Sequence, residues 1–216
     1  MSAKQTCIRF AHPCGSRTSS QWRQSLLKVI PDALDDDVAV FQSKTALSLT
    51  ARTPQASLRL RDSAVPVMRA VAQTAERMLD VEMLELEPSV AFTGYRWIYR
   101  VPRLVVARTG QPWEHWNEAA LDPEHVEEMR SRIETDLLRQ LSVWGKEIRK
   151  PAIEIESTGT AMVLKDAVSH GPRSVAAMAR KDVVFSSPAR IEGAFWVGLL
   201  QATGHGRVYR DGYAPA

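Results

Sequence analysis

Residues 47–61 read Leu-Ser-Leu-Thr-Ala-Arg-Thr-Pro-Gln-Ala-Ser-Leu-Arg-Leu-Arg. Leucines alternate with other residues in Leu47–Thr53 and again in Ser57–Arg61, which is the pattern of half-buried strands. Pro54 and Gln55 separate the two runs, as a hairpin turn would. The stretch therefore predicts a pair of adjacent antiparallel strands in the N-terminal half of the chain.

The segments on either side extend this hairpin to a complete α+β unit. Weak alternation from Thr6 to His12 predicts a first strand, and Ser19 begins a segment with helical apolar spacing. Val38–Phe41 is a short apolar run, Ser63 is a plausible helix cap, and Val81–Leu86 alternates again. The order strand, helix, strand, strand, helix, strand is that of a ferredoxin-like βαββαβ unit.

A second unit begins with a strand from Tyr95 to about Ala107. After a connector, Asp122 caps a helix over residues 122–142, with Pro123 at its first position. The later strands are expected at 152–156, 183–185 and 191–197. We therefore predict an α+β fold of two ferredoxin-like units, the second irregular with a helical insertion, in domains 1–92 and 93–216.

Composition limits the possible functions without choosing among them. The 216 residues are 44% hydrophobic, enough for a core, and the net charge of +3 does not by itself require a polyanionic ligand. Between Thr93 and Gly110, however, lie four arginines and no acid. Such an acid-free group of arginines is compatible with a basic surface on one side of the protein. Most charged runs, however, simply lie on the solvated surface without binding a partner.

Several classes of protein lack their sequence signals here. Cys7 and Cys14 cannot form a disulfide framework, and no pair of the five histidines has metal-ligand spacing along the chain. Neither a phosphate-binding loop nor a dinucleotide glycine motif occurs. There is no signal peptide or membrane-spanning apolar run. We expect a cytoplasmic protein without a metal or another cofactor.

The run Tyr95-Arg96-Trp97-Ile98-Tyr99-Arg100 favours a nucleic-acid ligand. In a strand, Arg96 and Arg100 share one face, while Tyr95, Trp97 and Tyr99 share the other. Aromatic rings can stack on bases and arginines can neutralise phosphates, as RNA-binding proteins require. The alternative is a half-buried strand, with its aromatics in the core and its arginines in water.

Three other segments are candidates for contact with RNA. The C-terminal sequence Gly204-His205-Gly206-Arg207-Val208-Tyr209-Arg210 joins glycines to cations, which suits close approach to phosphates and predicts an exposed His205 ring. Ser157-Thr158-Gly159 offers hydroxyls for a phosphate or a ribose 2′-hydroxyl, or is an ordinary turn. His12 is either a general base or a loop histidine bonded to the backbone.

Several short motifs resemble those of the CRISPR-associated repeat-cleaving endoribonucleases of the RAMP superfamily, and they follow one another along the chain in the order that the family has. The chain is most similar to the type I-F branch, with the type IV processing nucleases close behind. The resemblance rests on Leu58–Ala64, Tyr95-Arg96 with Arg100-Val101, Ser157-Thr158-Gly159 and Phe195–Leu199. The helix from Pro123 stands where the family has an arginine-rich helix for the major groove of a repeat hairpin.

This resemblance implies metal-independent cleavage, in which the ribose 2′-hydroxyl attacks the adjacent phosphate and leaves a 2′,3′-cyclic phosphate and a 5′-hydroxyl. The type I-F pattern is broken at its catalytic positions, because Ile155 replaces a serine, Val197 a tyrosine and Leu26 a histidine. We therefore predict another catalytic set: His12 as base, Arg23 for charge stabilisation, and Ser157 or Tyr99 for positioning. The predicted RNA-binding residues are Arg96, Arg100, Arg103, Arg130, Arg132, Arg139, Thr158, His205, Arg207 and Arg210.

The leading hypothesis is an endoribonuclease that cleaves CRISPR precursor RNA at repeat hairpins and stays on the mature guide RNA beside other guide-complex subunits. A second hypothesis is a non-catalytic RNA-hairpin-binding cap of a CRISPR ribonucleoprotein, which Ile155 and Val197 favour. A third is an unrelated α+β protein without any role in RNA, because every motif is short.

Overall fold

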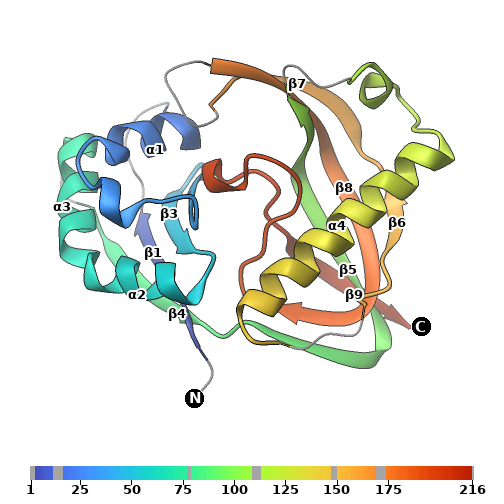
Figure 1. Cartoon of the computed structure of the whole chain (residues 1–216), viewed down its shortest axis with the longest axis horizontal. Coiled ribbons are helices and arrows are strands. Elements are labelled where there is room, and N and C mark those ends of the chain that lie inside the picture. The colour runs from blue at the N-terminus through green and yellow to red at the C-terminus, as the bar shows by residue number, and fades with distance from the viewer. Residues whose placement is uncertain are drawn as a thin grey trace. The chain divides into compact units, whose positions relative to one another are not determined.

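The computed structural model describes residues 3–11, 17–76, 79–108, 113–146, 150–168 and 174–215. It divides into two compact units (Figure 1). Unit 1 comprises residues 1–88 with Ala202–Gly204, and unit 2 comprises Ser89–Gln201 with His205–Ala216. No helix among the described residues is long and apolar enough to cross a membrane.

Unit 1 is a four-stranded antiparallel sheet with three helices. The strands are β1 (Gln5–Ala11), β2 (Val38–Gln42), β3 (Ala46–Ala51) and β4 (Val81–Leu86), and the helices are α1 (Ser19–Leu27), α2 (Pro54–Asp62) and α3 (Ala64–Ala75). A short 3-10 helix, η1 (Pro31–Ala33), precedes β2. The sheet order β2-β3-β1-β4 is that of a ferredoxin-like unit.

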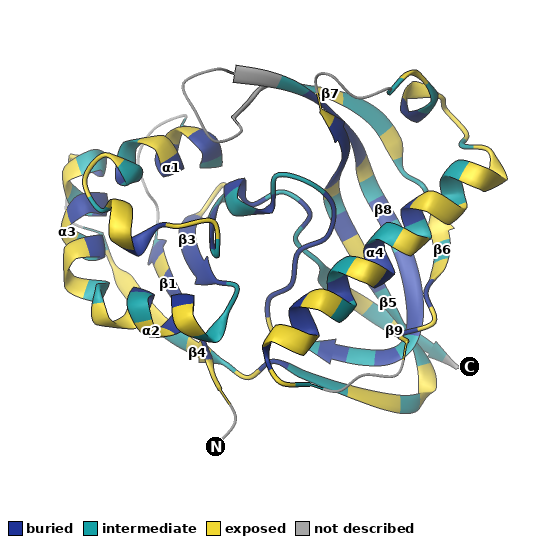
Figure 2. Ribbon diagram, in the orientation of Figure 1, coloured by how far each residue is buried: buried dark blue, intermediate teal, exposed yellow. Residues whose placement is uncertain are grey.

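The core of unit 1 lies between the sheet and the helices. Ile8 of β1 and Leu49 of β3 are fully buried, as are Trp22 of α1, Leu60 of α2 and Val67 of α3. Burial alternates along β1 beyond Cys7 and follows a helical period in α3, so each element buries one face (Figure 2).

The predicted strand at Ser57–Arg61 is wrong, because this segment belongs to helix α2. The Thr53 hydroxyl accepts a hydrogen bond from the Ala56 amide, and Pro54 occupies the first turn, where a missing N–H costs nothing. The helix buries Ala56, Ser57 and Leu60. The hairpin of unit 1 is formed by β2 and β3 instead.

Unit 2 contains a second antiparallel sheet and one long helix. The strands are β5 (Ser89–Arg108), β6 (Glu154–Ser157), β7 (Thr160–Val168), β8 (Ser174–Glu192) and β9 (Tyr209–Pro215). The other elements are α4 (Pro123–Val143) and the 3-10 helix η2 (Glu114–Asn117); a further 3-10 helix, η3 (Gln201–Thr203), begins at Gln201 of unit 2, and its other two residues belong to unit 1. The order is β6-β8-β5-β9, and β7 also pairs with β8.

The second sheet repeats the order of the first, with β6 and β7 together in the place of one edge strand. Helix α4 makes the first crossover and packs Met129, Ile133 and Leu137 into a core with Tyr99 and Phe185 (Figure 1). The two ferredoxin-like units are therefore confirmed. Unit 2 is irregular at the second crossover, since residues 193–208, all described, hold only the short helix η3.

One predicted boundary in this region is wrong. The strand predicted over Ile191–Val197 ends at Glu192, because Gly193 takes a φ of 110° that breaks the extended backbone. The glycine-containing tail continues as strand β9, which pairs with β5 from Tyr95 to Arg100.

Gly159 separates β6 from β7 and sets the path of this edge. Its φ is +65°, and an added Cβ would lie 2.1 Å from the carbonyl oxygen of Lys181 on β8. Gly145, after α4, has a similar φ of +69° but nothing within 4 Å of a built Cβ. The two glycines thus share a backbone conformation and differ in the space around them.

We expect Gly145→Ala to lower the free energy of unfolding by about 1–2 kcal/mol, the cost of a left-handed backbone for a residue with a Cβ. Gly159→Ala should cost about 1–3 kcal/mol more, because the strand must move away from Lys181. Urea unfolding followed by circular dichroism measures both. Equal losses for the two variants would show that close packing at Gly159 does not constrain the edge.

Candidate nucleic-acid interface

Strand β5 carries two aromatic residues to the surface of unit 2. Tyr95 and Trp97 lie beside Tyr213 of β9, with ring centroids 5.4 Å and 5.3 Å from the Tyr213 ring. They meet because Tyr95 and Trp97 pair with Pro215 and Tyr213 in the β5–β9 ladder. Tyr95 is 49% exposed and Tyr213 64% exposed. Aromatic area of this size in water is typical of a binding surface rather than of a core.

Two arginines flank the rings. The guanidinium carbons of Arg190 and Arg210 lie 5.2 Å and 5.4 Å from the centre of the Trp97 ring. We call Tyr95, Trp97, Tyr213, Arg190 and Arg210 the aromatic–arginine surface. It combines flat rings with planar cations, the two groups that hold unpaired bases and phosphates.

Glu192 connects the two arginines. Its Oε1 accepts hydrogen bonds from Arg190 at 2.5 Å and Arg210 at 3.2 Å. Partial burial by itself would raise the pKa of Glu192, but the hydrogen bonds and charges of Arg210 and Arg190 together lower it. Glu192 is therefore ionised at neutral pH, and the group of three carries one net positive charge.

A cavity of about 300 Å³ adjoins this group within unit 2. Glu192 and Arg210 are its charged lining residues. The other lining residues are Tyr99, Ile191, Gly193, Phe195 and Val208. The cavity thus combines apolar side chains with a polar, charged edge, an arrangement that suits a base or ribose with its phosphate at that edge.

Tyr99 forms part of the cavity wall, but its hydroxyl is fully used. The hydroxyl donates to the carbonyl oxygen of Ala189 at 2.8 Å and accepts from the amide of Ile191 at 2.8 Å. Burial raises the pKa of Tyr99 to about 12, against the opposing effect of the Ile191 amide, so the phenol stays protonated at neutral pH. The three aromatics predicted on one face therefore divide, with Tyr99 in the core and Tyr95 at the surface.

The predicted arginines Arg96 and Arg100 each have an acidic partner. Arg96 donates to Ser186 at 2.9 Å and pairs with Glu154 at 2.5 Å. Arg100 makes two hydrogen bonds to one oxygen of Asp211, at 2.9 and 2.7 Å. Both side chains remain partly exposed, so a phosphate would have to compete with these carboxylates.

The glycine-containing segment before β9 is more enclosed than its sequence predicts. His205 is half-buried rather than exposed, and burial, together with the charge of Arg103, lowers its pKa to about 4, so the ring is neutral at pH 7. Gly206 donates to the Arg103 carbonyl oxygen, and a Cβ there would lie 1.8 Å from Val197. The Arg207 guanidinium lies over the Trp196 and Tyr209 rings, at 5.8 and 5.2 Å.

The three predicted arginines of α4 all pair with carboxylates of the same helix. Arg130 contacts Glu127 and Glu134, Arg132 contacts Glu128, and Arg139 contacts Asp136. These (i, i+3) and (i, i+4) pairs give the polar face of α4 nearly balanced charge. A phosphate would find fewer available cations here than the arginine count suggests.

The turn Ser157-Thr158-Gly159 is held from beneath by a buried arginine that the sequence analysis did not identify. Arg180, with no exposed surface, donates to the carbonyl oxygens of Thr158 and Gly159 at 2.9 and 2.7 Å, and to those of Trp116 and Glu118. The Ser157 hydroxyl accepts from the Gly159 amide at 3.2 Å. The turn is exposed at Ser157, and its backbone is fixed by these bonds.

Arg23 lies in unit 1 and is also buried, with 5% exposure. It donates to the carbonyl oxygens of Val38 at 2.7 Å, Leu34 at 3.2 Å and Asp35 at 2.8 Å. These bonds give its guanidinium a structural role at the turn before β2. His12, the predicted base, lies outside the described residues.

The positions where the type I-F pattern has catalytic groups are apolar here. Leu26 and Val197 are fully buried, and Ile155 packs against the core of unit 2. These side chains have no polar atom for acid–base chemistry. Within unit 2 the predicted residues Tyr99 and Arg210 both line the cavity, together with Glu192. Glu192 also accepts a hydrogen bond from Arg190, and no sequence motif indicates that Arg190 and Glu192 lie here, because the register of β8 against β5 places them.

Two ferredoxin-like units place the chain in the fold class of the Cas6 proteins. The solved structures "Csf5, CRISPR-Cas type IV Cas6 crRNA endonuclease" (TM-score 0.73, 19% identity) and "Crystal structure of Cas6b" (TM-score 0.63, 10% identity) share this fold, each over 96% of this chain and 99% of that chain. The family model described as "Type IV CRISPR-associated endonuclease Csf5" matches residues 5–212. The chain belongs to this Csf5 family.

The resemblance seen in the sequence is therefore confirmed, with type IV, the second of the two branches it indicated, as the family matched. A search of curated protein sequences gives no match for this chain.

We expect Tyr99→Phe to lower the free energy of unfolding by about 1–3 kcal/mol, because the Ala189 carbonyl and the Ile191 amide lose their buried partner. The control Tyr213→Phe removes an exposed hydroxyl and should change stability by less than about 0.5 kcal/mol. Thermal unfolding measures both. If Tyr99→Phe left stability unchanged while abolishing RNA cleavage, Tyr99 would act in catalysis rather than in holding β8 to β5.

Proposed function

We propose that the protein is an endoribonuclease that cleaves CRISPR precursor RNA at repeat hairpins without a metal ion. It keeps the product stem-loop and joins other subunits in a guide complex. The observation that carries this proposal is the aromatic–arginine surface on a chain whose residues 5–212 match the Csf5 family. The family supplies the class of substrate, and the surface supplies the groups that would bind it.

The surface suits unpaired nucleotides at the foot of a hairpin. Tyr95 and Tyr213 offer exposed rings on which bases can stack, and stacking tolerates any base. The Arg190 and Arg210 side chains are partly exposed beside those rings, and Glu192 neutralises only one of the two charges. A phosphate placed there would gain bidentate contacts.

Cleavage by the 2′-hydroxyl needs a base, a cation at the phosphorane and an acid for the leaving oxygen. We place the scissile phosphate near Arg210, at the charged edge of the cavity, where the guanidinium can stabilise the added negative charge. Tyr99 is protonated and already bonded, so it positions β8 rather than accepting the proton. His12 and Arg23 belong to unit 1 and stay separate predictions: His12 as the base, whose imidazolium would return the proton to the leaving 5′-oxygen, and Arg23 only if it leaves its backbone partners.

Cleavage of a labelled repeat RNA should proceed at the same rate with and without EDTA. Replacing the 2′-hydroxyl of the scissile nucleotide with hydrogen should abolish cutting and leave binding nearly unchanged, because only the nucleophile is lost. The same replacement one nucleotide away is the control and should have little effect. Tight binding of wild-type protein without any cutting would instead favour the non-catalytic cap. Ile155 and Val197 already favour that alternative, because they stand where the type I-F pattern has a serine and a tyrosine.

Tyr95→Ala and Tyr213→Ala should each weaken binding of the repeat RNA roughly tenfold or more, since a stacked base contributes about 1–3 kcal/mol. Phe92→Ala is the matched control, because Phe92 is 45% exposed on the same strand and lies outside the aromatic–arginine surface. Filter binding at fixed salt measures all three. Loss of affinity in the Phe92 variant alone would place the RNA elsewhere on the sheet.

A further inference from the structure

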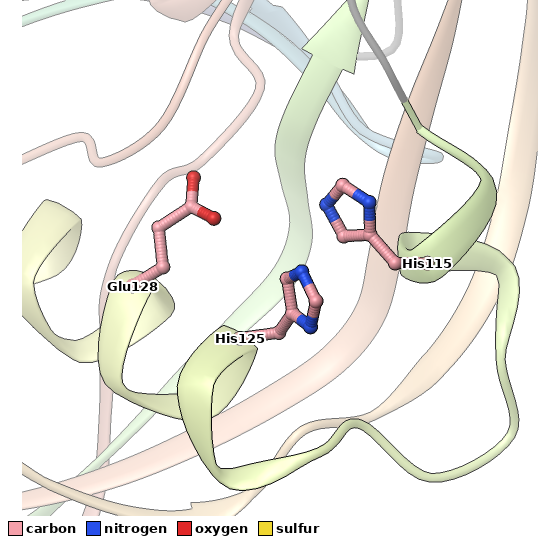
Figure 3. A group of neighbouring side chains, drawn as sticks. All are labelled: His115, His125 and Glu128. Carbon is pink, nitrogen blue, oxygen red and sulfur yellow. The ribbon is translucent and has the colours of Figure 1, made fainter.

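Three potential metal ligands meet in unit 2, away from the cavity. His115 belongs to η2, and His125 and Glu128 belong to the first turns of α4. One nitrogen of each imidazole and one oxygen of the carboxylate all lie within 4.8 Å of one another. Figure 3 shows one nitrogen of each ring and the Glu128 carboxylate facing the space between the three side chains.

Asp122 fixes the orientation of one of these imidazoles. Its Oδ1 lies 2.7 Å from Nδ1 of His125 and also accepts the backbone N–H of His125 at 2.9 Å as the cap of α4. With Nδ1 occupied by the carboxylate, Nε2 is the nitrogen left for a ligand. A carboxylate behind a histidine is the usual support of a metal-binding imidazole, because it sets the tautomer and the ring direction.

The second imidazole is held by packing. The His115 ring stacks on the His125 ring, with centroids 3.9 Å apart and an angle of 21° between the planes, and the Trp116 ring lies 5.2 Å from His115. Both histidines are half-buried, so their rings are restrained before any ion arrives. The pair is thus held close together in the free protein, and binding of one ion would open the stack so that both in-plane lone pairs meet at the metal.

We propose that His115, His125 and Glu128 bind one divalent transition-metal ion of the zinc class, with water as the fourth ligand. Two imidazoles and a carboxylate suit such an ion, whereas magnesium and calcium prefer oxygen ligands alone. Around a tetrahedral zinc ion with bonds of about 2.0–2.1 Å, ligand atoms lie about 3.3 Å apart. Rotation of the exposed Glu128, and of the two imidazoles out of their stack so that both ring planes contain the ion, closes the group to that spacing.

Arg132 does not prevent this arrangement. It lies 2.9 Å from Oε1 of Glu128 and also donates to the carbonyl oxygen of Val106. A carboxylate has two oxygens, so Glu128 can keep Oε1 on Arg132 and bind the metal through Oε2. The ion would then join η2 to the start of α4 and stabilise that connection.

This inference is independent of the proposed RNA cleavage, because none of the predicted catalytic residues is a ligand. A structural ion here and EDTA-insensitive cutting are compatible. The two ideas fail separately: loss of metal binding leaves the cleavage mechanism untouched, and loss of cleavage leaves the metal site untouched.

The test uses the full chain without a histidine tag, stripped of metal and titrated with Zn²⁺ by calorimetry and with Co²⁺ by visible absorption. We expect one equivalent of each metal, four-coordinate Co²⁺ bands, and a higher melting temperature with Zn²⁺. His115→Ala and Glu128→Gln should lower the affinity at least tenfold. His205→Ala, which alters a half-buried histidine of unit 2 outside the cluster, is the matched control and should still bind one equivalent.

Asp122→Asn tests the supporting carboxylate, because asparagine caps helices as well as aspartate and the fold should persist. Its affinity for Zn²⁺ should fall about 10–100-fold. The proposal is overturned if the wild-type chain takes up no metal, or if the His115 and Glu128 variants bind as tightly as wild type. Either result would mean that the stacked histidines are aromatic packing only.

Discussion

The antiparallel pairing of β5 with β8 is the constraint on which unit 2 depends. The two strands are 20 and 19 residues long, and their register sets Tyr99 opposite Phe185 and Phe92 opposite Ala189. This register carries the Tyr99 hydroxyl to the backbone of Ala189 and Ile191, and Arg190 to the ring of Trp97. The cavity and the aromatic–arginine surface both depend on this pair of strands, to which β9 adds Arg210 and Tyr213.

Much of the fold could be predicted from periodicity, because each sheet and helix buries one face. The stripe Met129, Ile133, Leu137 and Leu141 of α4 is buried as its spacing predicts. The alternating leucines of Ser57–Arg61 predict a strand, but the same spacing also fits one side of a helix. The Thr53 cap and Pro54 in the first turn favour the helix that the structure shows. Five alternating residues alone do not distinguish a strand from a helix.

The candidate site was less predictable than the fold, because arginines in similar sequence contexts differ in their burial and in their hydrogen-bond partners. Arg23 and Arg180 are buried and donate to backbone carbonyls, while those of α4 pair with carboxylates one turn away. Arg190 gains its place only through the β5–β8 register. His115 and His125 are ten positions apart, outside any ligand spacing, and meet only because η2 folds back on α4. Such contacts are long-range or depend on burial, and no short motif encodes them.

The pairing of β9 with β5 affects how the newly made chain folds. Strand β5 begins at Ser89, but Tyr213 and Arg210, which complete its aromatic–arginine surface, arrive more than a hundred residues later in β9. Until β9 leaves the ribosome, β5 presents an unpaired edge with exposed Tyr95 and Trp97, the kind of edge that recruits other strands. The aromatic–arginine surface therefore forms only after β9 has left the ribosome, and chaperones would have their greatest effect on this sheet in the interval before that.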